Sequence, residues 1–141
     1  MSLKSVAALA IAAVMTAGVA RAEIVHFSAT LTGADEVPAN SSAGHGQLTA
    51  ELETVQHVLT YRATYTGLSG PPTMAHFHGP ADPGANANVQ IPAMDTFSPI
   101  RGAVSVTPDQ QEQLLAGKWY FNIHTKDHPG GEIRGQVKRE N

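Results

Sequence analysis

Met74-Ala75-His76-Phe77-His78-Gly79-Pro80-Ala81 is the stretch around which the fold and the candidate site of this chain are organised. In an extended strand, residues i and i+2 share one face of the sheet. His76 and His78 are therefore predicted to point to the same side, with Phe77 on the opposite side, toward a core. Gly79-Pro80 ends the strand. The stretch thus predicts a strand end that carries two imidazoles on one face.

The same alternation of apolar and polar residues recurs along the chain and is typical of half-buried strands. It predicts strands over residues 24–32, 47–53, 57–66, 74–78, 89–94, 100–106, 118–124 and 132–138. One helix is expected, beginning with a Thr cap and a proline at Thr107-Pro108 and ending at Gly117. Short strands separated by turns predict an all-β fold, an antiparallel β-sandwich or barrel with one short helix.

A second stretch that carries imidazoles, Asn122-Ile123-His124-Thr125-Lys126-Asp127-His128-Pro129, runs from the end of a predicted strand into a turn. The alternation places His124 on the polar face of its strand, away from the main apolar stripe. We expect the fold to bring His124, and His128 across the turn, beside the His76/His78 pair. Imidazole suits copper, zinc, nickel and iron, so the four histidines predict a metal site. The alternative is an ordinary polar strand face that hydrogen-bonds to its neighbours.

The other titratable residues give weaker indications. His26 is expected in solvent on the polar face of its strand, and His57 is expected to be exposed at a hairpin end. His45 lies between two glycines, where a neighbour can approach closely. Asp35-Glu36 is either a carboxylate pair for catalysis or metal binding, or part of a solvated turn, and we expect the turn.

In the last predicted strand, the apolar residues are expected to face inward. The alternation therefore predicts that its polar residues point outward: Glu132, Arg134 and Gln136. Between the two stretches that carry imidazoles, residues 80–88 form a loop rich in glycine, proline and asparagine, long enough to cover or approach a site.

The N-terminus has the pattern of a secretory signal peptide. A short basic start is followed by a small, apolar run over residues 5–19, and Ala20-Arg21-Ala22 fits a cleavage site. The run is short for a membrane span, which needs about 20 residues. We expect cleavage after Ala22, a single mature domain over residues 23–141, and a periplasmic or secreted protein without a membrane span. A retained membrane anchor is the alternative.

Composition excludes several classes of function. Without Lys4 and Arg21, seven basic residues face twelve acidic ones, a net charge of −5 that argues against nucleic-acid binding. The chain has no cysteine, so it has no disulfide or thiolate ligand. It also has no Gly-x-Ser-x-Gly motif and no glycine-rich phosphate loop before a helix, which argues against nucleophilic hydrolases and nucleotide binding.

Five stretches together resemble the CHRD (chordin) domain family. In order they are Leu31-Thr32-Gly33-Ala34-Asp35-Glu36-Val37-Pro38, Ala75-His76-Phe77-His78-Gly79-Pro80-Ala81, Leu114-Leu115-Ala116-Gly117, Asn122-Ile123-His124-Thr125 and Pro129-Gly130-Gly131-Glu132-Ile133-Arg134-Gly135-Gln136. The resemblance covers essentially the whole mature chain. It implies an exported protein with a Greek-key β-sandwich similar to that of the copper/zinc superoxide dismutases.

By that similarity, His76 and His78 would be a pair of copper ligands and His124 the late ligand. Arg134 would loosely correspond to the arginine that guides the anion to copper. The dismutases also have a disulfide and a zinc-binding run of histidines and an aspartate, and this chain has neither. The resemblance therefore favours a single metal ion, copper before zinc, and does not favour dismutase activity. The alternative is a metal-free extracytoplasmic module that binds a protein partner in the cell envelope.

Overall fold

The computed structural model describes residues 18 and 21–141, so most of the predicted signal peptide lies outside the described residues. The strands are β1 (Ile24–Thr32), β2 (His45–Glu53), β3 (Val58–Thr66), β4 (Pro72–His78), β5 (Val89–Pro92), β6 (Ile100–Ser105), β7 (Tyr120–Thr125), β8 (Ile133–Gln136) and β9 (Lys138–Arg139). The helix α1 spans Pro108–Leu115, and a single 3-10 turn, η1, spans Gly33–Asp35.

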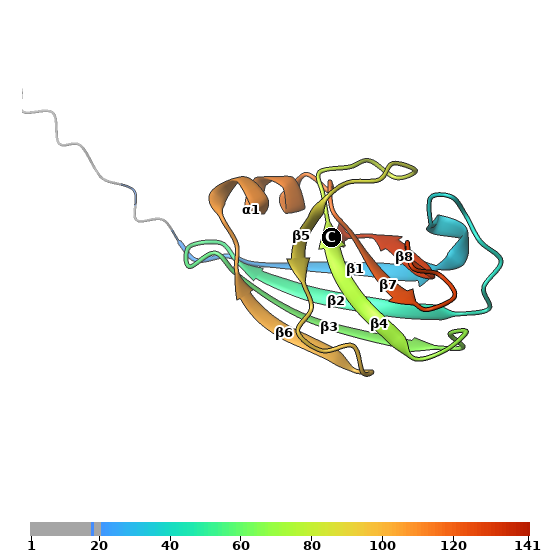
Figure 1. Ribbon diagram of the computed structural model, residues 1–141. Helices are drawn as coiled ribbons and strands as arrows, with labels where there is room; N and C mark the ends of the chain where they lie inside the picture. Colours follow the sequence, from blue (N-terminus) through green and yellow to red (C-terminus); the bar gives the residue numbers. More distant parts are fainter. Residues whose placement is uncertain (1–17, 19–20) are drawn as a thin grey trace, which may run out of the picture.

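The strands form one antiparallel sheet in the order β5-β4-β7-β8-β1-β2-β3-β6, with β9 added to β1. The sheet curls into a half-barrel, with β1, β2, β3 and β6 in one wall and β4, β5, β7 and β8 in the other (Figure 1). The chain crosses between the walls after β3, β5 and β6, so non-consecutive strands become neighbours, as in a Greek key. The predicted all-β, antiparallel fold with one α-helix is confirmed.

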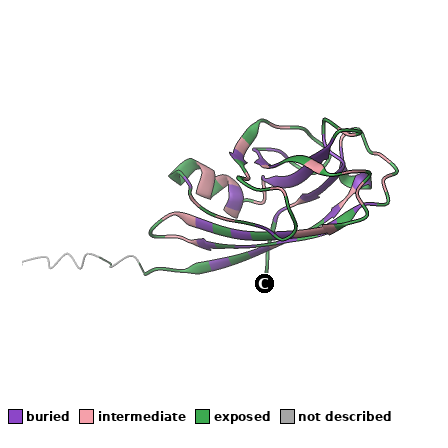
Figure 2. Ribbon diagram, turned by 60° about the horizontal axis from the view of Figure 1, so that its bottom comes forward, coloured by how far each residue is buried: buried purple, intermediate pink, exposed green. Residues whose placement is uncertain are grey.

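The core lies between the two walls, where the inward-facing residues of each strand meet (Figure 2). Phe77 is fully buried there, and its ring centroid lies 4.8 Å from that of Phe121 and 5.0 Å from that of Tyr61. Because successive strand residues alternate in direction, burying Phe77 in the core directs His76 and His78 to the other face of β4. The core thereby fixes the orientation of the histidine pair.

Helix α1 begins and ends as the sequence predicts. The Thr107 hydroxyl accepts a hydrogen bond from the Gln110 backbone, and the Gln110 side chain accepts one from the Thr107 backbone, which completes a capping box. Gly117 follows the helix with a φ of +70°. The η1 turn was not predicted; it forms where the Thr32 hydroxyl accepts a hydrogen bond from the Asp35 backbone.

Two of the polar residues predicted to point outward at the last strand are buried. Glu132 and Arg134 have relative exposures of 0 and 2%. Arg134, opposite Asn122 on β7, lies on the face that turns away from the core, but loops cover that face. The Glu132 carboxylate is instead enclosed by Ser42, Ser69 and Thr125, to which it is hydrogen-bonded. Backbone and side-chain groups of Ala85 and Asn86 bind the Arg134 guanidinium, and the Pro129 carbonyl lies over the end of β7. The result is a second buried layer, polar rather than apolar, outside the sheet.

Candidate metal centre

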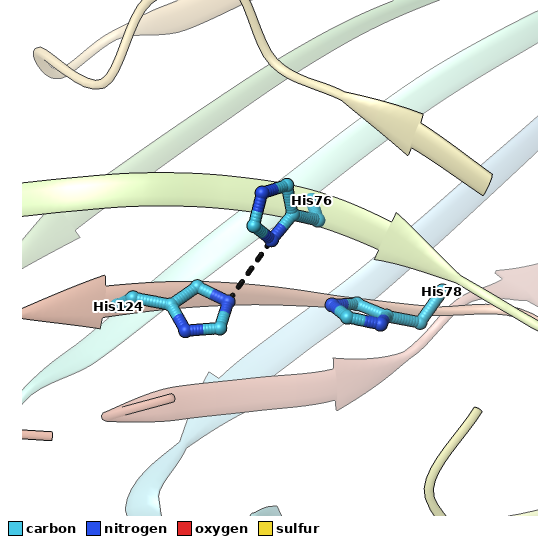
Figure 3. Close-up of side chains that lie close together, drawn as sticks. All are labelled: His76, His78 and His124. Carbon is cyan, nitrogen blue, oxygen red and sulfur yellow. Dashed lines mark hydrogen bonds between the residues drawn. The ribbon is translucent and has the colours of Figure 1, made fainter. Parts of the chain in front are cut away.

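Three histidines from two neighbouring strands meet in this polar layer (Figure 3). His76 and His78 come from β4, and His124 comes from β7, which pairs with β4. His76 Nδ1 lies 3.1 Å from His124 Nε2. One ring nitrogen from each of the three residues falls within 4.8 Å of the others, and no other group of three such side chains converges in residues 18 and 21–141. The structure thus brings together three of the four histidines expected to meet.

Asn122 lies at the centre of the group. It is directly opposite His76 across the β4–β7 pairing and is 2% exposed. Its Oδ1 is 3.0 Å from His78 Nε2 and 2.9 Å from His124 Nε2. Asn122 was not among the predicted site residues. It lies two residues before His124, so strand alternation alone places it on the same face.

Backbone carbonyls determine which ring nitrogens carry protons. His78 Nδ1 lies 2.9 Å from the Ala87 carbonyl, and His124 Nδ1 lies 2.9 Å from the Pro129 carbonyl. A carbonyl oxygen only accepts, so both Nδ1 atoms must donate. In the neutral imidazoles, each Nε2 then presents a lone pair. Histidine metal ligands usually have this arrangement, in which one ring nitrogen donates to a carbonyl and the other is free to bind the ion.

Three acceptor atoms therefore face one another: Nε2 of His78, Nε2 of His124 and Oδ1 of Asn122. The amide orientation follows from the other side of Asn122, where Nδ2 lies 3.5 Å from the Gly130 carbonyl and interacts with the Glu36 carboxylate. His76 Nδ1, 3.1 Å from His124 Nε2, can donate a proton to it, but no donor separates His78 Nε2 from Asn122 Oδ1, and a cation beside these two atoms would relieve their repulsion. The donor set therefore fits a bound metal ion.

The imidazoles are neutral at ordinary pH. Burial lowers the pKa of His76 to about 4, with smaller contributions from the neighbouring His124 and His78. Burial also lowers the pKa of His78, opposed by the hydrogen bonds that its protonated ring would donate to Ala87 and Asn122. The pKa of His124 is lowered by burial against the opposing hydrogen bond to Pro129. Metal ions bind neutral imidazole, so the cluster is ready to bind without first losing protons.

Glu36 is buried beside this cluster, which corrects our expectation of a solvated turn. Its side chain is 4% exposed, and Oε1 has no hydrogen-bond partner. Burial raises its pKa to about 7, opposed by the charge of Arg134, whose Nη1 lies 3.9 Å away. A Cβ on Gly131 would lie 2.2 Å from Oε1, so only glycine leaves room for this carboxyl group. Asp35 is exposed, as expected, and accepts a 2.7 Å hydrogen bond from Thr32.

Arg134 is held inside the polar layer. Its guanidinium donates to Asn86 Oδ1 at 2.8 Å and to the Ala85 carbonyl, and its Cζ lies 3.4 Å from the centroid of the Tyr120 ring. The opposite face of Tyr120 stacks on the His78 ring at a centroid distance of 4.8 Å. Arg134, Tyr120 and His78 therefore form one stack. Here the arginine supports a histidine ring through an aromatic ring and does not project into solvent.

The remaining histidines lie elsewhere. His128, expected as a fourth ligand, is outside the group of three, because the Thr125–His128 turn brings the Pro129 carbonyl to His124 instead. His128 lines a separate cavity of about 260 Å³. The others make local contacts: His26 with Glu51 at 3.4 Å, His45 with Thr66 at 3.0 Å and His57 with Gln111 at 2.9 Å.

Comparisons with known proteins were made on the same chain. Searches of the curated proteins and of the solved structures found no match. Within the part of the chain that the structure describes, no helix is both long enough and apolar enough to cross a bilayer. Among protein families, the model of the CHRD domain matches residues 27–137, a span that includes His76, His78 and His124.

Proposed function

The chain belongs to the CHRD domain family, and from this premise we propose that it is an exported β-module that binds one copper ion. His76, His78 and His124 would hold the ion, with Asn122 Oδ1 as a fourth donor in place of the expected His128. Bound copper would supply one-electron redox chemistry or be carried as cargo. The chain's own residues position the imidazoles and keep them neutral.

One observation carries this proposal: the lone pairs of two imidazoles and one amide oxygen face the same small volume. The carbonyls of Ala87 and Pro129 hold the two rings in this orientation. Imidazole nitrogens suit copper, and the absence of cysteine leaves no thiolate that would favour a closed structural zinc site. Zinc also accepts imidazole, so the metal itself must be tested.

Export is part of the same proposal. Folded structure begins directly after the expected cleavage point, since the Glu23 carbonyl accepts a 3.0 Å hydrogen bond from Thr54 and β1 starts at Ile24. Cleavage after Ala22 would therefore leave the domain intact. The mass of the protein recovered from outside the cytoplasm should correspond to a chain that begins at Glu23. A full-length mass would contradict cleavage.

The test of metal binding uses the mature protein purified without an affinity tag. We expect one equivalent of copper by elemental analysis, or on titration of the metal-free protein, and weaker binding of zinc. The double variant His76→Ala/His78→Ala should lose this copper. The matched control His26→Ala/His45→Ala removes two histidines outside the cluster and should keep it.

Two outcomes would redirect the proposal. If the wild-type protein refuses copper, or if both double variants retain it equally, the alternative is a metal-free extracytoplasmic module that binds a protein partner in the cell envelope. If copper binds but superoxide is removed no faster than by free copper, a dismutase role is excluded while copper holding or transfer remains.

A further inference from the structure

Of the two methionines of residues 23–141, Met74 borders the histidine cluster, and Met94 follows β5, the strand that pairs with β4. Met74 is two residues before His76 on β4 and directly opposite His124 on β7. Strand alternation places Met74 on the same face as the histidine pair. Directly opposite residues of antiparallel strands have Cβ atoms about 4.5–5.5 Å apart. Met74 therefore borders the cluster at the His124 side.

Met94 continues the same row. The Ala93 N–H donates to the Ala75 carbonyl at 2.9 Å, so the β4–β5 pairing continues one residue beyond Pro92. This register brings the backbone of Met94 alongside that of Met74. Met94, Met74 and His124 thus follow one another across three neighbouring segments, from the edge of the sheet to the cluster.

The exposure of the two methionines is unusual. The side chain of methionine is apolar and flexible, and it is among the residue types most often buried. Here Met94 is 92% exposed and Met74 is 46% exposed. Neither belongs to the core, so packing does not explain them. His76, the cluster member nearest Met74 along β4, is also the least buried of the three histidines.

Thioether sulfur is a soft ligand that selects Cu(I), whereas Zn(II) in proteins is held by thiolate, imidazole and carboxylate groups. We propose that Met94 and Met74 form a thioether path by which Cu(I) passes between the protein surface and the imidazole cluster. The inference rests on the proposed function and adds to it the redox state in which copper is exchanged. Copper stays Cu(I) throughout, so the transfer needs no oxidant or reductant.

The test compares the mature protein with the variant Met74→Leu/Met94→Leu. Leucine has a similar volume and polarity, so the change removes sulfur with little effect on packing. Val55→Leu alters another half-exposed apolar residue far along the chain and serves as the control. Each protein is loaded with Cu(I) without oxygen, and transfer to bathocuproine disulfonate is followed by stopped-flow absorbance. Zn(II) transfer to a zinc chelator is measured in parallel.

We expect Cu(I) transfer from the double variant to be slower by about tenfold, with Zn(II) transfer unchanged, because only the soft ion gains from thioether contacts. X-ray absorption at the copper edge should show sulfur scattering in the Cu(I)-loaded wild type, and the double variant should lack it. The single change Met94→Leu, at a side chain in solvent, keeps the test valid if the double variant folds poorly.

Equal Cu(I) transfer rates in wild type and variants, together with no sulfur scattering, would overturn the path while leaving the copper site intact. A different result marks failure of the proposed function itself: no copper bound by the wild type, or copper retained by His76→Ala/His78→Ala. The methionine path and the histidine site can therefore fail separately.

Discussion

Asn122 lies between the imidazoles of His78 and His124, with Oδ1 3.0 and 2.9 Å from their Nε2 atoms. It would contribute an oxygen ligand to the proposed site between two rings that the Ala87 and Pro129 carbonyls hold in place. Groups that orient metal ligands affect binding almost as strongly as the ligands do. At the scale of single residues, copper affinity in the proposed site should therefore depend on this amide as well as on the histidines.

Replacing Asn122 by leucine should weaken copper binding by about 10- to 100-fold, the range measured for groups that support metal ligands. Leucine has a similar volume but offers no oxygen to the cluster. Affinity is measured by competition with a chelator of known strength. Asn88→Ala, at an exposed position in the covering loop, should leave affinity unchanged. If Asn122→Leu bound copper as tightly as the wild type, the amide would neither bind the ion nor position its ligands.

Glu36 should make the stability of the metal-free protein depend on pH. Its pKa is raised from 4.5 to about 7, mainly by burial. The folded state therefore keeps a proton that the unfolded chain releases. This contribution to stability is complete below pH 4.5 and is lost as the pH rises through about 7.

Glu36→Gln removes this titration. The difference in Tm between variant and wild type should therefore move in favour of the variant as the pH rises from 4.5 to above 7. Thermal unfolding of the metal-free proteins at a series of pH values measures it. Asp35→Asn, at the exposed neighbour, should give a difference that does not vary with pH. If the difference in Tm between Glu36→Gln and wild type did not change with pH, the Glu36 carboxyl group would not titrate between pH 4.5 and about 7.

At the scale of elements, Glu132 ties together segments that are far apart in the chain. Its carboxylate accepts hydrogen bonds from the Ser42 hydroxyl at 2.6 Å, from the Ser69 N–H and hydroxyl at 2.8 and 2.7 Å, and from the Thr125 hydroxyl at 2.6 Å. Burial alone would raise its pKa, but these bonds together outweigh burial and lower the pKa to about 2. The loop before β2, the loop before β4 and the end of β7 are thereby held around one charge.

Glu132→Gln should destabilise the protein by about 1–3 kcal/mol at pH 7. The donors of Ser42, Ser69 and Thr125 would lose their charged acceptor, and the new amide NH₂ group would face them. The wild-type contribution is present above pH 4.5 and is lost as the pH falls through about 2, so the deficit should shrink at low pH. Urea unfolding at pH 7 and pH 3 measures both values. Glu112→Gln, on the exposed side of α1, is the control. An equal deficit at both pH values would contradict the charge-based explanation.

The elements also show what the sequence could predict. Alternation placed the main strands within a few residues of their observed bounds, and the cap at Thr107 fixed the start of the helix. The i, i+2 spacing put His76 and His78 on one face. Alternation reports polarity along a strand, however, and does not report what covers the strand. Glu36 was therefore expected in solvent, and the burial of Glu132 and Arg134 by segments distant in sequence could not be predicted.

The covering loops also explain the missing fourth histidine. The contacts of Ala87 and Pro129 with the cluster are made by backbone carbonyls, which carry no sequence signature. Asn122 could have been found from its place on the His124 face, but an asparagine on a polar strand face has no particular meaning until its neighbours are known. Contacts between segments far apart in the chain, which the local sequence pattern does not report, determine which residues belong to the site.

At the scale of the whole molecule, the two walls of the half-barrel join where β8 meets β1. Gly135 on β8 makes that junction close: a Cβ there would lie 2.1 Å from the Thr30 carbonyl oxygen. Because this neighbour is backbone, a side chain at the junction would push the strands apart. The junction also anchors β8, which carries Arg134 beneath the cluster.

Gly135→Ala should lower the free energy of unfolding by about 1–3 kcal/mol, the usual cost of overpacking a buried position. Urea unfolding of the metal-free protein gives the value. Gly70→Ala changes a glycine whose added Cβ would meet no atom within 4 Å, and it should have little effect. If both variants were equally stable, β8 and β1 would be able to move apart and accommodate a side chain at low cost.

Trp119 is the single tryptophan of the chain and is fully buried beside the end of β4. The Cβ that Gly79 lacks would lie 2.3 Å from its indole Cδ1, so the indole packs against the backbone that directly follows His78. Light emitted by an indole is quenched when a paramagnetic ion lies close by. Filling the cluster with Cu(II) should therefore dim the ultraviolet fluorescence of the protein, whereas diamagnetic Zn(II) should leave it bright. The fluorescence of Trp119 would then report copper loading without an added dye.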